Sequence, residues 1–278
     1  MTIPSVSSSS SPAARKARSR RRTLTKKGWI PDQHGAWPMA ILPPLLGIGA
    51  AGPHPIHLLL MSAWLSAFGA FHALELYWKS PKRRRGAVRP ALASWCGLTV
   101  LFGVPLLVIQ PGFLAWAPFF APLALIALIE VVRGKERAIL TRVTSVGAAA
   151  LMTPVAAARG LIAPLSPDLT QAWVLGAILG AYFIGTIPLV RSLIRGRREM
   201  RWIIGSIIWH LVSFIGVAIA FMKGSVVLVL VLVWVALTVR AGAMPLLQRR
   251  GFALTPMRIG LGEMVWSLLV TVCLLASV

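Results

Sequence analysis

Acidic residues are scarce in this sequence. The 278-residue chain has 7 Asp and Glu against 29 Lys and Arg, and the four charged residue types together make up only 13% of it. A soluble domain carries about 25% charged residues and lacks long apolar runs. With a hydrophobic fraction of 57% and a mean hydropathy of +0.77, the composition excludes an ordinary soluble domain and predicts an all-α polytopic membrane protein.

Cysteine is also rare. Cys96 and Cys273 lie far apart in apolar segments, and the sequence has no CxxC motif and no Cys/His cluster. Neither a disulfide framework nor a zinc site is therefore expected. The sequence has no nucleotide-binding glycine loop and no acyl-transfer triad, so it predicts no metal and no other cofactor.

The first 28 residues are rich in serine and then in basic residues, eight of which are Lys or Arg. Their apolar content is too low to form a core, so residues 1–28 are predicted to be a disordered cytoplasmic tail. Its cations would hold it on an anionic leaflet. The arginine run at 20–22 resembles a twin-arginine signal, but the next segment is rich in proline and lacks a convincing cleavage site. We therefore interpret that segment as a retained first helix, and residues 29–278 as the transmembrane helical domain.

Apolar stretches of about 20 residues recur along this domain, as a hydrocarbon core of about 30 Å requires. They predict nine transmembrane helices, of which the first and the eighth are short: 36–52, 57–78, 91–109, 113–132, 140–158, 171–190, 202–222, 224–239 and 258–277. In the sixth of these, the GxxxG spacing of Gly176 and Gly180 predicts a helix-packing seam.

The basic residues alternate from one side of the predicted bundle to the other. The tail and the loops after the second, fourth, sixth and eighth spans hold 27 of the 29 Lys and Arg, with Arg240 counted in the last of these loops. The other side keeps only Arg159 and Lys223. The positive-inside rule then places the amino terminus in the cytoplasm and the carboxyl terminus outside. Because topology accounts for the charge, no nucleic-acid partner is expected.

Ionisable residues inside a span are costly and are candidates for function. On the second span, His72, Glu75 and Lys79 share one face, either as a functional row or as an interfacial ion pair with a histidine above it. On the sixth, Arg191 and Arg195 continue one face toward Glu199, either as a site or as an interfacial charge ladder.

Two further spans carry an isolated polar residue. His210, near the middle of the seventh span, is read either as a hydrogen-bonded packing histidine or as part of a path. Glu263, in the ninth span, has no local partner and is expected to meet an arginine across the bundle.

Residues 29–49 read W-I-P-D-Q-H-G-A-W-P-M-A-I-L-P-P-L-L-G-I-G. This run resembles the opening signature of the YwiC-like family of bacterial integral membrane proteins. The resemblance implies a multi-pass protein of the bacterial inner (plasma) membrane. His34 within the run is interpreted either as a site residue or as an interfacial imidazole at a bent helix entry.

Two basic loops, K-S-P-K-R-R-R at 79–85 and R-S-L-I-R-G-R-R at 191–198, follow the second and sixth spans. Nine spans with these two loops are similar to the UbiA-type intramembrane prenyltransferases, which implies two four-helix halves plus a ninth helix. In that family, Asp-rich motifs in both loops hold Mg²⁺ on an isoprenyl diphosphate. Neither loop here contains an aspartate, whereas Arg and Lys bind phosphate directly.

These observations predict a cytoplasm-facing cleft among the first, second and sixth spans that binds an isoprenoid or another lipid phosphate without Mg²⁺. The candidate residues fall into three groups: His34 and Glu75 as catalytic candidates, Lys79, Arg191 and Arg195 for the anion, and His72, Trp37 and Tyr182 in the cleft wall. Whether the protein is an enzyme stays open. The alternatives are a small permease or anion carrier, with His72 and His210 along its path, and a non-catalytic assembly factor for a membrane complex.

Overall fold

The computed structural model describes residues 19, 23–31, 35–134, 139–194, 196, 199–252 and 254–278. Within these residues every regular element is a helix, so the predicted all-α fold is confirmed. The long helices correspond one to one to the predicted spans: α2 (Ala36–Ala51), α3 (Ile56–Lys79), α5 (Arg89–Ile109), α6 (Ala117–Val132), α7 (Ile139–Ala158), α8 (Thr170–Ile194), α9 (Met200–Met222), α10 (Leu228–Arg249) and α11 (Pro256–Leu275). Three short helices join them: α4 (Lys82–Arg85), η1 (Pro111–Trp116) and η2 (Pro167–Leu169).

Helix length agrees with the prediction except in the eighth span. Eight of the described helices are long and apolar enough to cross a membrane. The remaining one, α2, has 16 residues and so is about 24 Å long, which confirms a short first span. The prediction of a short eighth span was wrong, because α10 has 22 residues and continues through Arg240 to Arg249.

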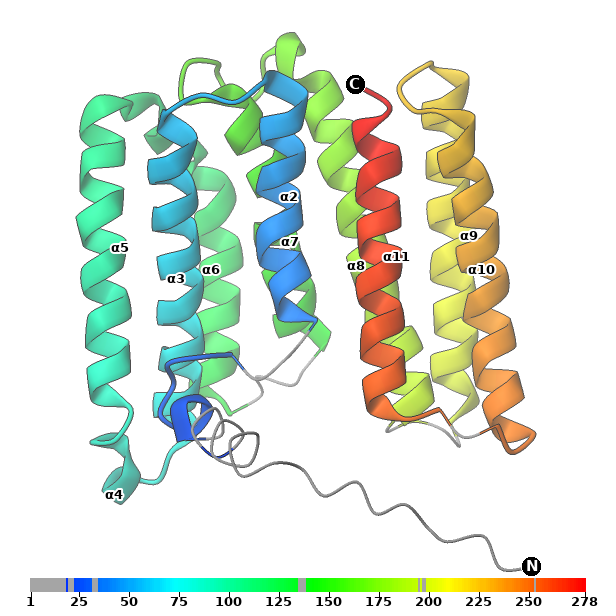
Figure 1. Cartoon of the computed structure of the whole chain (residues 1–278), viewed down its shortest axis with the longest axis horizontal. Coiled ribbons are helices and arrows are strands. Elements are labelled where there is room, and N and C mark those ends of the chain that lie inside the picture. The colour runs from blue at the N-terminus through cyan, green and yellow to red at the C-terminus, as the bar shows by residue number, and fades with distance from the viewer. Residues whose placement is uncertain are drawn as a thin grey trace, which may run out of the picture.

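The helices form a broad, flat bundle (Figure 1). α3 and α5 pack together at one end of its long axis and α9 and α10 at the other, with α2, α7, α8 and α11 between them. We call the end that carries α4 and the last residues of α3, α8 and α10 the basic end. The carboxyl terminus lies at the opposite end (Figure 1).

A proline on α2 and a tryptophan on α3 allow a hydrogen bond between these two helices. Pro44 has no N–H, so the carbonyl of Ala40 lacks the partner that it would have in an uninterrupted helix. The indole of Trp64 on α3 donates to that carbonyl at 2.7 Å. The proline therefore creates an acceptor for a contact between helices, and the backbone oxygen is satisfied inside the membrane.

Small residues bring α2, α7 and α8 close together. Gly47 of α2 packs directly on the backbone of α7, where the Thr153 hydroxyl also donates to the Pro43 carbonyl at 3.0 Å. On α8, a Cβ at Gly176 would lie 2.9 Å from the Ala150 carbonyl oxygen. The predicted packing seam on α8 is thus confirmed, since lipid favours close backbone contact over bulky apolar side chains.

Replacing Gly47 with alanine tests this packing. The new Cβ would overlap the Thr153 carbonyl oxygen and lie 2.9 Å from the Ala156 Cβ, so α2 and α7 must separate. Gly47→Ala should lower the free energy of unfolding by about 1–3 kcal/mol in detergent. The control Gly97→Ala, on an exposed face of α5 with open space around it, should change stability little or raise it by up to about 1 kcal/mol. Equal effects of the two variants would show that the close approach contributes nothing.

The orientation in the membrane stays a prediction of the charge pattern, and labelling can test it. Lys82 is exposed at the basic end and Ala276 is exposed at the opposite end. In a variant whose two cysteines are replaced by alanine, a thiol reagent that cannot cross the membrane should label Ala276→Cys in intact cells. It should label Lys82→Cys only after the membrane is permeabilised. The reverse pattern would contradict a cytoplasmic basic end.

Candidate functional site

Two of the predicted site residues, His34 and Arg195, lie outside the described residues. The others lie in three places. His72 and Glu75 are half-buried on α3 and Lys79 is exposed at its end. Trp37 of α2 contacts Phe68 edge to face with ring centroids 5.9 Å apart. Phe68 precedes His72 by one helical turn, so the structure brings Trp37 to the α3 face that carries His72 and Glu75.

Arg191 lies on α8 in a different setting. Its guanidinium stacks on the Trp202 ring at 3.9 Å from the centroid. The Trp202 indole donates to the Glu199 carboxylate at 3.0 Å, and Arg201 pairs with the same carboxylate. The hydrogen bond from Arg201 keeps the pKa of Glu199 below its ordinary value, so this carboxylate stays charged at neutral pH and holds Trp202 under Arg191.

The expected continuous face from Arg191 to Glu199 was wrong. α8 ends at Ile194, and Glu199 precedes the first residue of α9. The turn is tight because Gly196 packs against Trp202 and its N–H donates to the Arg191 carbonyl at 2.7 Å. A side chain at 196 would collide with the indole, so this position requires glycine.

α2 and α7 lie between α3 and α8 along the bundle (Figure 1). Lys79 and Arg191 accordingly belong to separate parts of the basic end, and their joint binding of one anion stays a prediction. Tyr182, assigned to the cleft wall, is 2% exposed on α8, and its hydroxyl contacts Glu263 of α11.

That contact belongs to a buried ionic cluster that sequence reasoning did not assemble. Arg240 of α10 and Glu263 of α11 form a two-point pair, with Nη1 to Oε1 at 3.0 Å and Nη2 to Oε2 at 3.4 Å. Their side chains are only 8% and 13% exposed. The Tyr182 hydroxyl lies 3.2 Å from Oε2 and 3.1 Å from the Glu263 carbonyl oxygen. The expectation that Glu263 meets an arginine across the bundle is confirmed.

The cluster lies at one level in the middle of the bundle. Tyr182, His210, Arg240 and Glu263 are each twelve residues from the end of their helix that lies opposite the basic end. At 1.5 Å per residue this is about 18 Å along each helix. Four helices thus contribute one polar or ionisable side chain each at a depth where such groups are rare and functional.

His210 adds an unused acceptor to the cluster. It is 2% exposed, and its Nδ1 hydrogen-bonds the Ser206 carbonyl at 2.7 Å, which confirms the predicted hydrogen bond. A carbonyl only accepts, so Nδ1 carries the proton and Nε2 of the neutral ring is an acceptor. Among the described residues Nε2 has no hydrogen-bond partner, and neither have the Ser206 hydroxyl and Arg240 Nε.

The sequence contained both charged residues of this cluster, but they were assigned to different kinds of segment. Glu263 required a partner, yet Arg240 was assigned to a loop because the apolar run stops at Val239. Along α10 the buried residues Val233, Leu237 and Arg240 follow helical spacing, which would have extended the helix.

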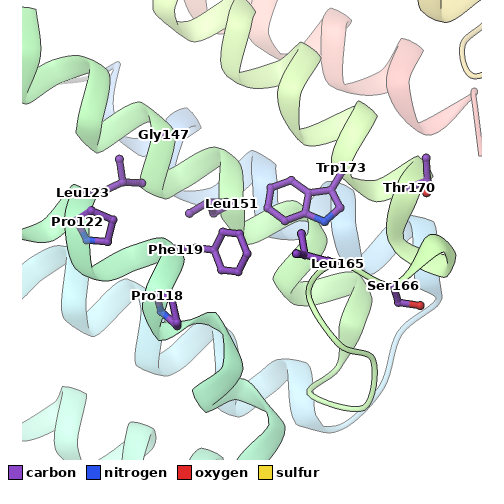
Figure 2. A pocket seen from close by; sticks show the side chains of 10 residues that line it. All are labelled: Pro118, Phe119, Pro122, Leu123, Gly147, Leu151, Leu165, Ser166, Thr170 and Trp173. Atoms are coloured by element: carbon purple, nitrogen blue, oxygen red, sulfur yellow. The ribbon is translucent and has the colours of Figure 1, made fainter.

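A second feature is an apolar groove between α6, α7 and α8, away from the basic end. It has a volume of about 680 Å³ and is lined by Pro118, Phe119, Pro122, Leu123, Gly147, Leu151, Leu165, Ser166, Thr170 and Trp173. Figure 2 shows the rings of Phe119 and Trp173 near Leu151, with Gly147 further along α7. A smaller hollow, floored by Ala150, Gly176 and Ala177, adjoins it at Gly147. Among the residues that the structure describes, no group of three or more His, Cys, Asp or Glu could hold a metal ion.

Helices of this length and composition define a multi-pass membrane protein. Residues 30–157 match the model of the family described as YwiC-like protein. The chain is also similar to "Uncharacterized protein YwiC" of Bacillus subtilis (strain 168), with 28% identity over 192 residues, which are 66% of this chain and 75% of the relative. The predicted resemblance to the YwiC-like family is confirmed over residues 30–157, and the chain is a multi-pass membrane protein similar to YwiC. No solved structure matches it, and the UbiA-type resemblance stays a prediction.

Removing one charge of the buried pair should be far worse than removing both. Arg240→Met leaves the Glu263 carboxylate unpaired in an apolar interior and should cost about 3–5 kcal/mol of unfolding free energy. The double variant Arg240→Met/Glu263→Met should recover most of that loss, because no uncompensated charge remains. Unfolding of the purified variants in mixed detergent measures both. A double variant as unstable as the single one would show that Arg240 and Glu263 do not neutralise each other.

Proposed function

We propose that the protein binds an isoprenoid or another lipid phosphate from the bilayer and holds the phosphate with basic side chains rather than with Mg²⁺. The observation that carries the proposal is the apolar groove between α6, α7 and α8. Its volume of about 680 Å³ is within the range of ligand sites, about 300–1,000 Å³. Its lining of aromatic, aliphatic and proline side chains suits a hydrocarbon chain.

The geometry of α8 relates this groove to the basic end. Trp173 in the groove and Arg191 are eighteen residues apart, which is five turns and about 27 Å along one helix face. A lipid whose phosphate lies at Arg191 could extend its chain along this face toward the hollow floored by Gly176 and Ala177.

Arg191 is suited to a phosphate. Its guanidinium face is covered by Trp202, so its N–H groups point outward from the edge of the stack. Arg and phosphate form two-point, charge-assisted hydrogen bonds that need no metal. In this proposal Lys79 and Arg195 supply further positive charge at the predicted cytoplasmic face. His34 and Glu75 are the candidates for proton transfer, and His72 and Trp37 line the α3 side.

The alternative of a small permease or anion carrier is favoured by a different observation. An Arg–Glu pair with Tyr182 and His210 at mid-depth is typical of ion paths and proton relays in membrane proteins. Uptake of solute by proteoliposomes would support this alternative, whereas a copurifying lipid phosphate would support the first proposal.

The lipid proposal is tested by native mass spectrometry of the gently solubilised protein with an added isoprenyl phosphate. Binding should survive EDTA. Arg191→Ala should weaken it at least tenfold, because one charge-assisted contact contributes about 1.5–3 kcal/mol. Arg250→Ala, an exposed arginine after the end of α10, is the matched control and should have little effect.

A second variant separates chain binding from phosphate binding. Gly147→Leu fills the groove floor and should weaken binding of a long isoprenyl phosphate more than of a short one. Binding that requires Mg²⁺, or that is indifferent to both Arg191→Ala and Gly147→Leu, would refute the proposal.

A further inference from the structure

The buried cluster at mid-depth has two properties that a purely structural ion pair does not need. It contains three buried polar atoms without a hydrogen-bond partner among the described residues, namely Arg240 Nε, His210 Nε2 and the Ser206 hydroxyl. These residues are 8%, 2% and 0% exposed. A buried polar atom without a partner is costly, so such a group calls for an explanation.

One of these atoms lies at a close contact between α8 and α9. A Cβ at Gly185 on α8 would lie 3.0 Å from Trp209 Cδ1 and 3.2 Å from His210 Nε2, so both rings pack directly on the glycine. Gly185 follows Tyr182 by three residues, so His210 packs about one helical turn from the side chain that bonds Glu263. The unpartnered acceptor therefore lies on the α8–α9 contact, at the same depth as the ion pair.

The Arg240 guanidinium has a second support besides Glu263. It lies over the Trp266 ring at 5.2 Å from the centroid. A cation over an aromatic face is attracted by the ring, and this attraction does not involve the carboxylate. By contrast, the Glu263 side chain makes its polar contacts through its carboxylate, with Arg240 and with the Tyr182 hydroxyl.

We propose that Arg240 is a binding site for a small monocarboxylate, which replaces the Glu263 side chain on the guanidinium while Glu263 takes up one proton. The site now holds a planar carboxylate in a two-point contact, so the ligand class follows from the geometry that is already present. His210 Nε2 and the Ser206 hydroxyl are the groups available for a further polar atom of the ligand. This site is independent of the lipid proposal and would provide the carrier alternative with its substrate contact.

Because the site at mid-depth must stay electrically neutral, one proton is taken up for each ligand carboxylate that binds. In the resting state, Arg240⁺ and Glu263⁻ cancel. When the ligand enters as an anion and a proton from water adds to a Glu263 oxygen, Arg240⁺ and the ligand carboxylate cancel and Glu263 is neutral. No bond other than this O–H forms, and no net charge is left in the apolar interior, where it would be costly.

The ionisable groups around Glu263 are few. α11 packs on α2, α8 and α10. These helices present Tyr182 from α8 and Arg240 from α10, while residues 36–51 of α2 include no ionisable side chain. His210 on α9 is the next group. Because the exchange removes Arg240 from Glu263, the displaced carboxylate is the group that takes up the proton.

The test uses the purified full-length chain and L-lactate as the probe. Isothermal titration in two buffers of different ionisation enthalpy should show one proton taken up per lactate bound. Binding should weaken about tenfold for each pH unit above the titration of Glu263. Chloride, which lacks carboxylate geometry, is the control anion and should bind at least tenfold more weakly.

Glu263→Gln is the decisive variant, because its amide resembles the protonated acid and leaves Arg240 open. It should bind lactate at least tenfold more tightly than the unmodified protein at pH 8, with no proton uptake and no pH dependence. Lactate should also raise its melting temperature by mass action. The double variant Arg240→Gln/Glu263→Gln, which leaves no unpaired charge, should fold and show neither effect.

Several results would overturn the proposal. These are lactate binding without proton uptake, equal affinity for chloride, weaker binding by Glu263→Gln than by the unmodified protein, or undiminished binding by the double variant. If Glu263→Gln does not fold, the proton count and the pH dependence of the unmodified protein decide alone. Absence of lactate binding to the unmodified protein also refutes the site.

Discussion

A charge in the middle of a membrane must be neutralised, and the Arg240–Glu263 pair shows how this chain meets that constraint. An unpaired arginine or glutamate at mid-span costs roughly 2.5–3.5 kcal/mol even by the smaller estimates. The pair joins α10 to α11, and the Tyr182 hydroxyl adds α8 to the same carboxylate. Since each helix must place its residue at the same depth, the contact sets the relative register of three helices. It also explains why α10 continues past an arginine that would otherwise end an apolar span.

The rest of the bundle is held by close backbone contact. In lipid the hydrophobic effect does not bring helices together, so the association depends mainly on the packing of small residues and on satisfied backbone groups. Gly47 of α2 on Thr153 of α7, and Gly176 of α8 on Ala150, are the clearest examples. Such contacts are rigid because a single methyl group disturbs them. The ionic cluster is different, since three of its buried polar atoms have no hydrogen-bond partner among the described residues.

The two proposals use separate parts of this bundle. The groove between α6, α7 and α8 is apolar and suits a hydrocarbon chain, with Arg191 five turns away on the same face of α8. The ionic cluster lies among α8, α9, α10 and α11 and contains one cation, one carboxylate and an imidazole acceptor that has no partner among the described residues. The family match covers residues 30–157, so the groove draws on matched and unmatched helices while the cluster lies outside the match.

Hydrophobic length and loop charge were enough to predict the helices of this fold, because each span must cross the same apolar thickness. The same reasoning predicted that Glu263 needs an arginine, since an isolated carboxylate is too costly there. It could not identify Arg240, because hydropathy treats an arginine as the end of a span unless its partner is known. It also extended the α8 face to Glu199, because a helical wheel contains no information about the packing of Gly196 on Trp202 beyond the end of the helix at Ile194. The depth shared by Tyr182, His210, Arg240 and Glu263 became visible only when the true ends of four helices were known.

The central claim is that Glu263 exchanges its place on Arg240 for a ligand carboxylate and becomes protonated. Infrared difference spectroscopy of the purified protein, recorded at constant pH with and without L-lactate, observes this directly. The account predicts that lactate produces the carbonyl stretch of a protonated carboxyl group, and that this band is absent from Glu263→Gln although lactate still binds. Lactate binding without that band, or the same band in Glu263→Gln, would contradict the account.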